Sequence, residues 1–256
     1  MNKRSSWALP YFIFLVMFVV LPLLLVLVYA LQYGSGHFTL SNVTKFFTDS
    51  DALSTFAVSI EIAIETTLLC ILIGYPAAWI LSNKEYNRSA VTIVLFIMPM
   101  WINALMRTLA TAELFNVLGI HLGKGTLLYG MVYDYLPFMI YPIYNVLDKM
   151  DKSYAEAAQD LGATPWKVFW KVIVPLSMPG VASGVLMVFM PTVSTFAISE
   201  FLTNNKIKLF GTIIQENINS SMWNYGAALA LIMLVIIGLT SFLQGSDKKS
   251  SEGGLV

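Results

Sequence analysis

Acidic side chains inside long apolar stretches are the residues of this sequence whose chemistry is most informative. An ionised side chain at the depth of the hydrocarbon costs at least ~2.5 kcal/mol on insertion scales, so each one is expected to face a cavity or a partner. Five acids and one base have this setting: Glu61, Glu65, Glu113, Asp134, Glu200 and Arg107. An excess of acid over base is what a path for a cation needs, and aromatic faces can add cation–π contacts.

Each of these residues also has a simpler explanation. Glu61 and Glu65 are expected near the outer end of their helix, where they can reach water. Arg107 and Glu113 can form a structural ion pair, and Trp101 can be an ordinary packing residue. With these alternatives open, the candidate residues for a substrate path are Glu200, Asp134, Trp101, Tyr133 and Arg107.

The elements that must position these residues are membrane-spanning helices. The chain is 57% apolar and 12% charged, whereas soluble domains are about 45–50% apolar and about 25% charged. A spanning helix needs about 20 mostly apolar residues, and the stretches that qualify are 7–31, 55–81, 91–114, 126–147, 172–199 and 223–243. The predicted fold class is an all-α membrane protein with six transmembrane helices. Pro137, Pro142 and Pro191 are expected to kink spans four and five, either to line a cavity or to pack.

The lysines and arginines predict the orientation, because they are retained on the cytoplasmic side of short loops. With the amino terminus inside, ten of the 15 fall inside and four outside, which leaves Arg107 within a span. Both termini and the segment 148–171 are therefore expected in the cytoplasm, and the segment 200–222 outside. We expect one membrane domain over residues 1–244 and a flexible tail over 245–256. The apolar core of the first span is too long for a signal peptide.

Composition also argues against several other classes of protein. The net charge of zero leaves no basic face for nucleic acid. Cys70 is the single cysteine, so it can form neither an intrachain disulfide nor a cysteine-based metal site, and we predict that it is buried filler. His37 and His121 fall in outer loops and form no HExxH cluster. We therefore expect no catalytic residue and no metal site.

The most informative pattern lies in the segment 151–179, which is too polar to span a membrane. Ser153 and Glu156 have the spacing of a capping box, and Gly162 stands where a left-handed C-cap residue is wanted. Thr164 and Pro165 then begin a second helical piece. Its apolar stripe and its basic face consist of Trp166, Phe169, Trp170 and Ile173, and of Lys167 and Lys171. On patterning alone, the simpler interpretation is an amphipathic helix on the inner leaflet.

The same segment resembles a known signature. Glu156, Ala157 and Ala158, then Gly162, then the string 172–175 (Val-Ile-Val-Pro), resemble the EAA loop of the ABC importer permeases, with valine at both aliphatic positions. The resemblance implies the MetI-like type I permease fold and a coupling helix between spans four and five that fits a cleft of a cytoplasmic ATPase. The residues that it assigns to coupling are Glu156, Ala157, Ala158, Gly162 and Ala163.

Three further strings of residues narrow the resemblance to one subfamily. Residues 74–79, 98–107 and 136–142 look like those of spermidine/putrescine permeases, and the likeness extends over residues 9–242. In that subfamily an acidic residue near the outer end of span five helps to pass amine groups, and Glu200 is the matching position. Aspartate is more usual there, so the longer side chain leaves its geometry open.

The resemblance implies a multi-pass permease subunit in the plasma membrane of a bacterium. Its expected partners are the lipid bilayer, a second homologous permease, two copies of an ABC ATPase and an extracellular polyamine-binding protein. ATP and Mg²⁺ would be bound by the ATPase, because the string 119–125 lacks the spacing and the hydroxyl of a phosphate-binding loop. Three rival hypotheses stay open: a different cargo such as thiamine, ferric iron or an amino-acid derivative, a membrane-embedded enzyme, and a channel or scaffold that needs no ATPase.

Overall fold

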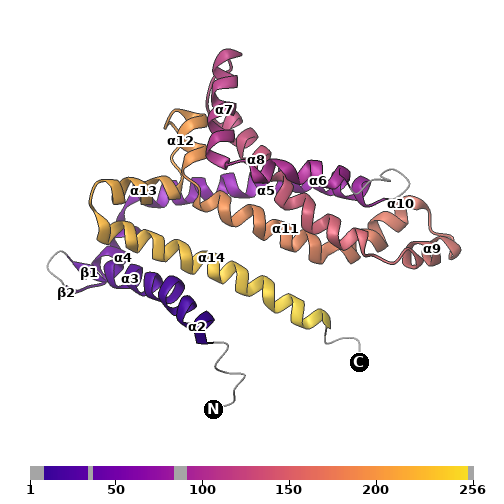
Figure 1. The fold of residues 1–256 in the computed structure, drawn as a ribbon, viewed down its shortest axis with the longest axis horizontal. Helices are drawn as coiled ribbons and strands as arrows, with labels where there is room; N and C mark the ends of the chain where they lie inside the picture. The colour runs from indigo at the N-terminus through magenta and orange to yellow at the C-terminus, as the bar shows by residue number, and fades with distance from the viewer. Residues whose placement is uncertain (1–8, 34–36, 84–90, 253–256) are drawn as a thin grey trace.

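The chain is helical almost throughout the part that the computed structural model describes, which is residues 9–33, 37–83 and 91–252 (Figure 1). Its first half consists of α2 (Leu9–Leu15), the π-helical turn η1 (Val16–Val20), α3 (Leu21–Ala30), β1 (Gln32–Tyr33), β2 (His37–Phe38), α4 (Ser41–Thr48), α5 (Ser50–Ser82), α6 (Val91–Ile97), the 3-10 turn η2 (Met98–Trp101) and α7 (Ala104–Val117). Its second half consists of α8 (Lys124–Asp148), α9 (Ser153–Asp160), α10 (Pro165–Val168), the π-helical turn η3 (Phe169–Ile173), α11 (Val174–Ser194), α12 (Ala197–Thr203), α13 (Phe210–Asn219) and α14 (Trp223–Glu252). The two short strands pair antiparallel.

Three helices within the described residues are long and apolar enough to cross a membrane: Leu9–Ala30, Ser50–Ser82 and Pro165–Ser194. The pair Val91–Trp101 and Ala104–Val117 would make a fourth span if it is counted as one. The apolar part of α14, Trp223–Leu239, is shorter. All six predicted stretches are largely helical, but the count of six spans is not confirmed by this criterion.

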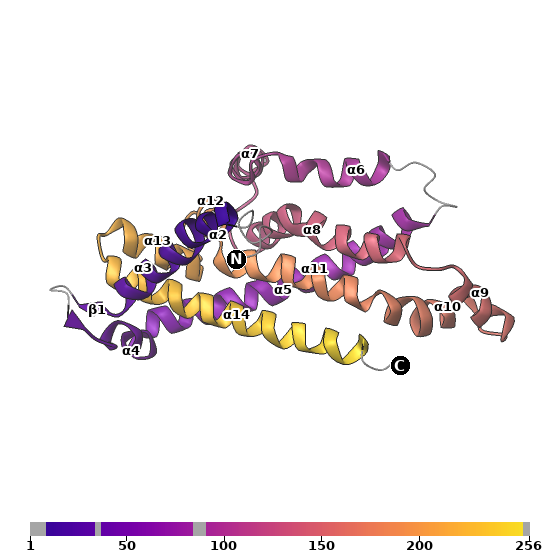
Figure 2. The ribbon, with the colours of Figure 1, turned by 60° about the horizontal axis from the view of Figure 1, so that its bottom comes forward.

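The core of the bundle is formed by α5, α8 and α11, which lie side by side in both views of the ribbon (Figure 2). Cys70, Met139, Ile143 and Val188 are buried together there, which confirms Cys70 as a buried residue. A Cβ atom on Gly180 would lie 2.9 Å from the carbonyl oxygen of Pro142. Close approach of helices over small residues is the usual way in which helices pack in a membrane.

The predicted third span over residues 91–114 is not one continuous helix, because the chain bends by 88° between Trp101 and Ala104. Ile102 has an extended backbone, and the Asn103 side chain caps the new helix by accepting hydrogen bonds from the N–H groups of Leu105 and Met106. An N-cap residue of this kind starts a helix rather than continuing one. As a result α7 projects away from the bundle (Figure 1).

The predicted fifth span, 172–199, also differs from the structure at both ends. The helix begins at Pro165 and ends at Ser194, where Thr195 turns to an extended conformation. Residues 197–199 belong to the separate helix α12, and most of the predicted outer loop 200–222 is helical because α13 occupies Phe210–Asn219. The apolar side chains of α13 are the reason, since Phe210 and Ile214 are buried against Phe46 and Leu229.

Gly211 is the point where α13 crosses the end of α11. A Cβ atom there would overlap the Ser194 carbonyl oxygen and would lie 2.7 Å from that of Thr195. We expect Gly211→Ala to lower the free energy of unfolding by about 1–3 kcal/mol, the usual cost of overpacking. The thermal unfolding midpoint of the purified protein in detergent measures this. Gly125→Ala is the matched control, because a Cβ atom at Gly125 meets nothing within 4 Å; equal midpoints for the two variants would contradict the prediction.

Candidate functional site

A buried ion pair joins α7 to α8. Arg107 Nη2 lies 3.1 Å from Asp134 Oδ1, and the two side chains are only 6% and 2% exposed. The Thr108 hydroxyl donates a hydrogen bond to Asp134 Oδ2 at 3.2 Å. The Arg107 guanidinium also lies 5.6 Å from the centre of the Tyr133 ring. Nε and Nη1 of Arg107 are buried and have no hydrogen-bond acceptor among the described residues.

The structure therefore brings together three of the five candidate path residues, Arg107, Tyr133 and Asp134. The alternative pairing of Arg107 with Glu113 is not observed, because six residues of helix place these side chains on different faces of α7, and Glu113 is exposed. Trp101 lies on η2 at the bend and is 77% exposed. No hydrogen bond or ring contact within the described ranges links Trp101 or Glu200 to the buried pair.

Glu200 lies in the first turn of α12, not on the helix of the fifth span as predicted. Its half-buried side chain lines a small cavity of about 90 Å³. Phe196, Asn205, Thr212, Gln215, Glu216 and Asn219 complete the lining. Glu200 therefore faces a polar recess made with α13, at the same end of the molecule as α4.

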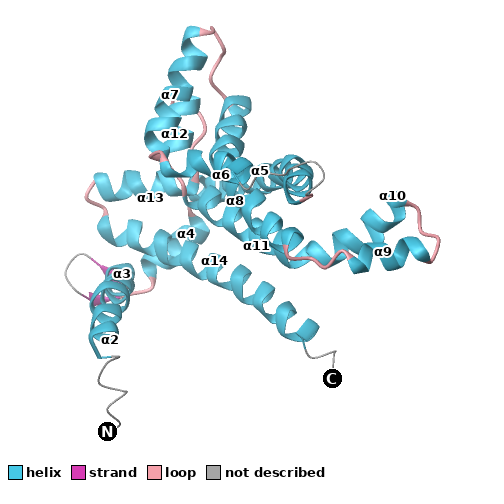
Figure 3. Cartoon of the chain, turned by 45° about the vertical axis from the view of Figure 1, so that its right-hand side comes forward, coloured by secondary structure: helices cyan, strands magenta, loops and turns pink. Residues whose placement is uncertain are grey.

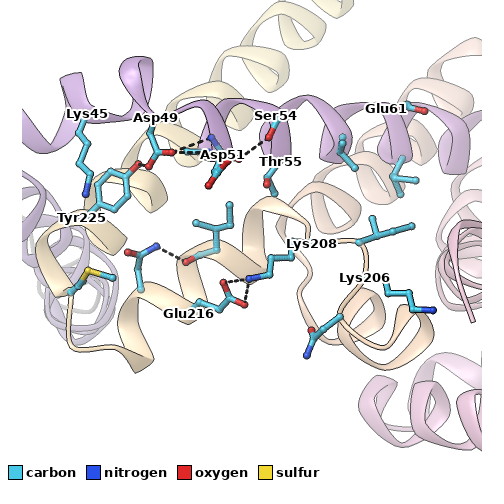
Figure 4. A pocket seen from close by; sticks show the side chains of 18 of the residues that line it. Lys45, Asp49, Asp51, Ser54, Thr55, Glu61, Lys206, Lys208, Glu216 and Tyr225 are labelled. Carbon is cyan, nitrogen blue, oxygen red and sulfur yellow. Dashed lines mark hydrogen bonds and ion pairs between the residues drawn. The ribbon is translucent and has the colours of Figure 1, made fainter.

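A larger cavity of about 840 Å³ opens at this end and is lined by charged side chains from several helices (Figure 4). Lys208 pairs with Glu216 at 2.7 Å across its floor. Asp49 caps α5 and accepts a hydrogen bond from the Tyr225 hydroxyl at 2.8 Å. This hydroxyl hydrogen bond is the main cause that lowers the pKa of Asp49. The side chains of Lys208, Glu216 and Asp49 are therefore held in place by partners within the cavity.

Glu61 and Glu65 on α5 meet a lysine that the sequence did not connect with them. Lys124 Nζ at the start of α8 lies 2.6 Å from Glu61 Oε1 and 2.8 Å from Glu65 Oε1. The exposed fraction of the side chain is 45% for Lys124, 55% for Glu61 and 35% for Glu65. The spacing of the glutamates places both on one helix face, but nothing in the sequence indicates a partner about 60 residues away.

The opposite end of the molecule carries α9 and α10, which extend beyond the bundle (Figure 3). Gly162 has φ +81° and ends α9, as predicted. Its N–H donates to the Gln159 carbonyl at 2.8 Å, and the Ala163 N–H donates to the Ala158 carbonyl at 3.0 Å. These two hydrogen bonds are those of a Schellman C-cap.

The predicted capping box at Ser153 is wrong. Ser153 is already helical, and the Asp151 carboxylate accepts a hydrogen bond from the Ser153 N–H at 2.9 Å. This hydrogen bond is the main cause that lowers the pKa of Asp151. Glu156 and Ala157 are exposed on α9. Glu156 also borders a cavity of about 350 Å³ between α9 and the carboxyl ends of α5 and α8.

The piece from Pro165 onward is the beginning of the helix that runs to Ser194, rather than a separate helix on the inner leaflet. Its indole rings are exposed, at 70% for Trp166 and 52% for Trp170. Phe169 points the other way, and its ring lies 5.4 Å from that of Trp79 on α5. Apolar periodicity could find the stripe, but it could not tell which of its rings faces the bundle.

The amino-acid sequence is similar to one family of transport proteins and to individual permease proteins. The profile of the family described as binding-protein-dependent transport system inner membrane component matches residues 2–246. The chain is 32% identical to the spermidine/putrescine transport system permease protein PotB of Escherichia coli, over 88% of this chain and 90% of that one. It is 30% identical to the corresponding protein PotC of Shigella flexneri, over 77% and 75%.

The fold is also similar to that of a solved structure. A chain of the crystal structure of a bacterial ABC transporter involved in the import of the acidic polysaccharide alginate superposes with a TM-score of 0.69. The match covers 96% of this chain and 98% of that one at 18% identity. At this identity the likeness shows a shared fold, and it agrees with the predicted fold of an ABC importer permease.

Proposed function

This chain belongs to the family of binding-protein-dependent transport system inner membrane components, and from that premise we propose that it is a permease subunit that carries polyamines through the membrane. Transport would follow alternating access, driven by a separate ATPase. The chain itself would change no covalent bond. Spermidine and putrescine are the proposed cargo because the relatives PotB and PotC are named as permease proteins of spermidine/putrescine transport systems.

The observation that carries the proposal is the position of α9. This short helix extends from one end of the bundle, ends in the left-handed Gly162 and exposes Glu156. An exposed helix held by a fixed turn is suited to docking on a separate protein. We propose that Glu156, Ala157, Ala158, Gly162 and Ala163 contact the ATPase, which would hold ATP and Mg²⁺.

The family is one of inner membrane components, and the chain is a multi-pass protein. We propose that α9 and both termini are cytoplasmic, so that the charged 840 Å³ cavity faces outward. A polyamine-binding protein would dock at that outer end. The similarity to both PotB and PotC supports a second, homologous permease as the partner in the membrane.

The proposed path begins at Glu200, whose carboxylate faces the small outer recess. Trp101 and Tyr133 would offer aromatic faces to the amine groups, and the pair of Arg107 with Asp134 would lie deeper. Because Arg107 already neutralises Asp134, an amine would have to displace the guanidinium in order to use this carboxylate. Glu200 is therefore the stronger candidate for the first contact.

Uptake of radiolabelled spermidine by cells that lack their own importer, but express this chain with its partner subunits, tests the proposal. We expect Glu200→Gln to reduce uptake at limiting spermidine about tenfold or more, because a hydrogen bond to a charged group contributes about 1.5 kcal/mol or more. Glu113→Gln is the matched control, since Glu113 is exposed on α7. Equal uptake by the two variants at equal membrane levels would count against Glu200.

The same assay separates the rival cargoes. If the wild-type complex takes up no spermidine or putrescine, the polyamine assignment fails and labelled thiamine, ferric iron and amino-acid derivatives become the next candidates. If membranes that take up the cargo show no ATP hydrolysis by the complex, the assignment as an ATP-driven importer also fails.

A further inference from the structure

The ring of Phe169 lies where the cytoplasmic helices meet the bundle. Its centre is 5.4 Å from that of Trp79 and 5.9 Å from that of Tyr75, and both contacts are edge-to-face. Edge-to-face geometry is the favoured arrangement of aromatic pairs. Tyr75 and Trp79 are one helical turn apart on α5, so a single ring from the cytoplasmic side touches two successive turns of that helix.

Tyr75 makes a second contact with the same neighbouring helix. The Ser177 hydroxyl donates to the Val174 carbonyl at 2.9 Å, so the Tyr75 hydroxyl is the donor in its 2.7 Å hydrogen bond with Ser177 Oγ. Both residues are buried, Tyr75 at 8% exposed and Ser177 completely. Tyr75 is therefore fixed to η3 through its ring and to α11 through its hydroxyl.

The π-helical turn η3 lies between these two attachments. It occupies Phe169–Ile173, so the Phe169 contact lies at its start and the Ser177 contact lies just beyond its end. π-helical turns inside α-helices are weak points that often occur at functional sites. The turn η3 is thus bracketed by contacts to one helix, α5.

The position of the Phe169 ring is not that of an aromatic belt at the membrane interface. Trp166 and Trp170 have the exposure expected of such a belt, in which aromatic rings sit at the level of the lipid headgroups. Phe169 stacks between these two indoles and α5, and it packs against the buried cluster that contains Tyr75 and Leu81. Its ring is directed toward the bundle and not toward lipid.

We propose that Phe169 is the positioning residue through which a displacement of α9 and α10 reaches α5, with η3 as the hinge. This inference rests on the proposed function, because it takes an ATPase as the source of the displacement. When α9 is pushed, η3 bends, and the Phe169 ring carries Tyr75 and Trp79 with it. The far end of α5 carries Ser54 at the outer cavity, so the motion of one end is transmitted to the other.

The test follows the outer end of α5 directly. Ser54 is exposed, and Cys70 is buried, so an impermeant maleimide added from outside reports on Ser54→Cys alone. In the assembled transporter we expect the labelling rate of Ser54→Cys to change severalfold on addition of ATP and Mg²⁺. Adding Phe169→Leu keeps apolar volume but removes the ring. The labelling rates with and without ATP and Mg²⁺ should then become equal while ATP hydrolysis persists.

Two further variants separate positioning from packing. Trp170→Leu removes an exposed ring from the adjacent position and should leave the ATP-dependent change intact. Phe169→Tyr keeps the ring and should retain that change as well. The proposal is overturned if Phe169→Leu shows the wild-type response to ATP, or if the otherwise wild-type Ser54→Cys transporter shows no response.

The readout does not depend on the cargo. Spermidine uptake by the same Ser54→Cys cells reports on the polyamine assignment separately. Lack of uptake, together with an ATP-dependent change in labelling that Phe169→Leu abolishes, would refute the cargo and leave the role of Phe169 supported.

Discussion

Replacing Asp134 with asparagine is expected to destabilise the protein by about 3–5 kcal/mol, the usual cost of removing one partner of a buried ion pair. Arg107 would keep its charge, because a guanidinium cannot be deprotonated in a protein. Two of its nitrogen atoms are already buried without an acceptor within the described residues, so it has little with which to replace the lost carboxylate. The amount of inserted protein and its thermal unfolding midpoint in detergent measure the loss.

The double variant Arg107→Met with Asp134→Leu is the informative control. It removes both charges and fills similar volume, and such replacements are often neutral or stabilising. Thr108 would not be left without a partner, because the Ala104 carbonyl oxygen lies 2.9 Å from its hydroxyl and can accept that hydrogen bond instead. We expect the double variant to recover the wild-type unfolding midpoint. An Asp134→Asn protein as stable as wild type would contradict the assignment of a buried ion pair.

The double variant also decides whether Asp134 belongs to the substrate path. If the pair is only structural, uptake should recover together with stability. If an amine uses the Asp134 carboxylate during transport, the double variant should be stable and present in the membrane but inactive.

The sequence contains enough information to predict the helices and the turn that ends α9. Apolar stretches of sufficient length mark the spans, and Gly162 could be placed as a C-cap because few residues other than glycine adopt a positive φ without strain. Its observed φ of +81° and its Schellman hydrogen bonds confirm this prediction. Local rules are sufficient in both cases, since the residues concerned are neighbours in the chain.

The pairings between helices could not be predicted in this way. Arg107 and Asp134 are 27 positions apart, and which side chain Arg107 meets depends on the bend at Ile102 and Asn103. A hydropathy profile does not reveal this bend, because the residues on both sides of it are apolar. The same limitation applies to α13, whose polar residues resemble an outer loop until Phe210 and Ile214 are seen to be buried.

Glu156→Ala is expected to lower uptake at least tenfold, while the protein stays folded and inserted in the membrane. Glu156 is exposed on α9, and no hydrogen bond of its side chain is seen in the described structure, so its removal should not change the unfolding midpoint. The loss of uptake would arise because the carboxylate no longer contacts the ATPase. Asp160→Ala is the matched control, since it removes the same charge from an exposed position on the same helix.

Gly162→Ala tests the turn instead of the charge. A Cβ atom there meets nothing within 4 Å, so the cost comes from the positive φ alone and should be about 1–2 kcal/mol. We expect this strain to shift α9 relative to α10 and to reduce uptake together with the amount of ATPase that copurifies with the chain. If Glu156→Ala and Gly162→Ala both transport at the rate of Asp160→Ala, α9 is not the element that couples the ATPase to the membrane domain.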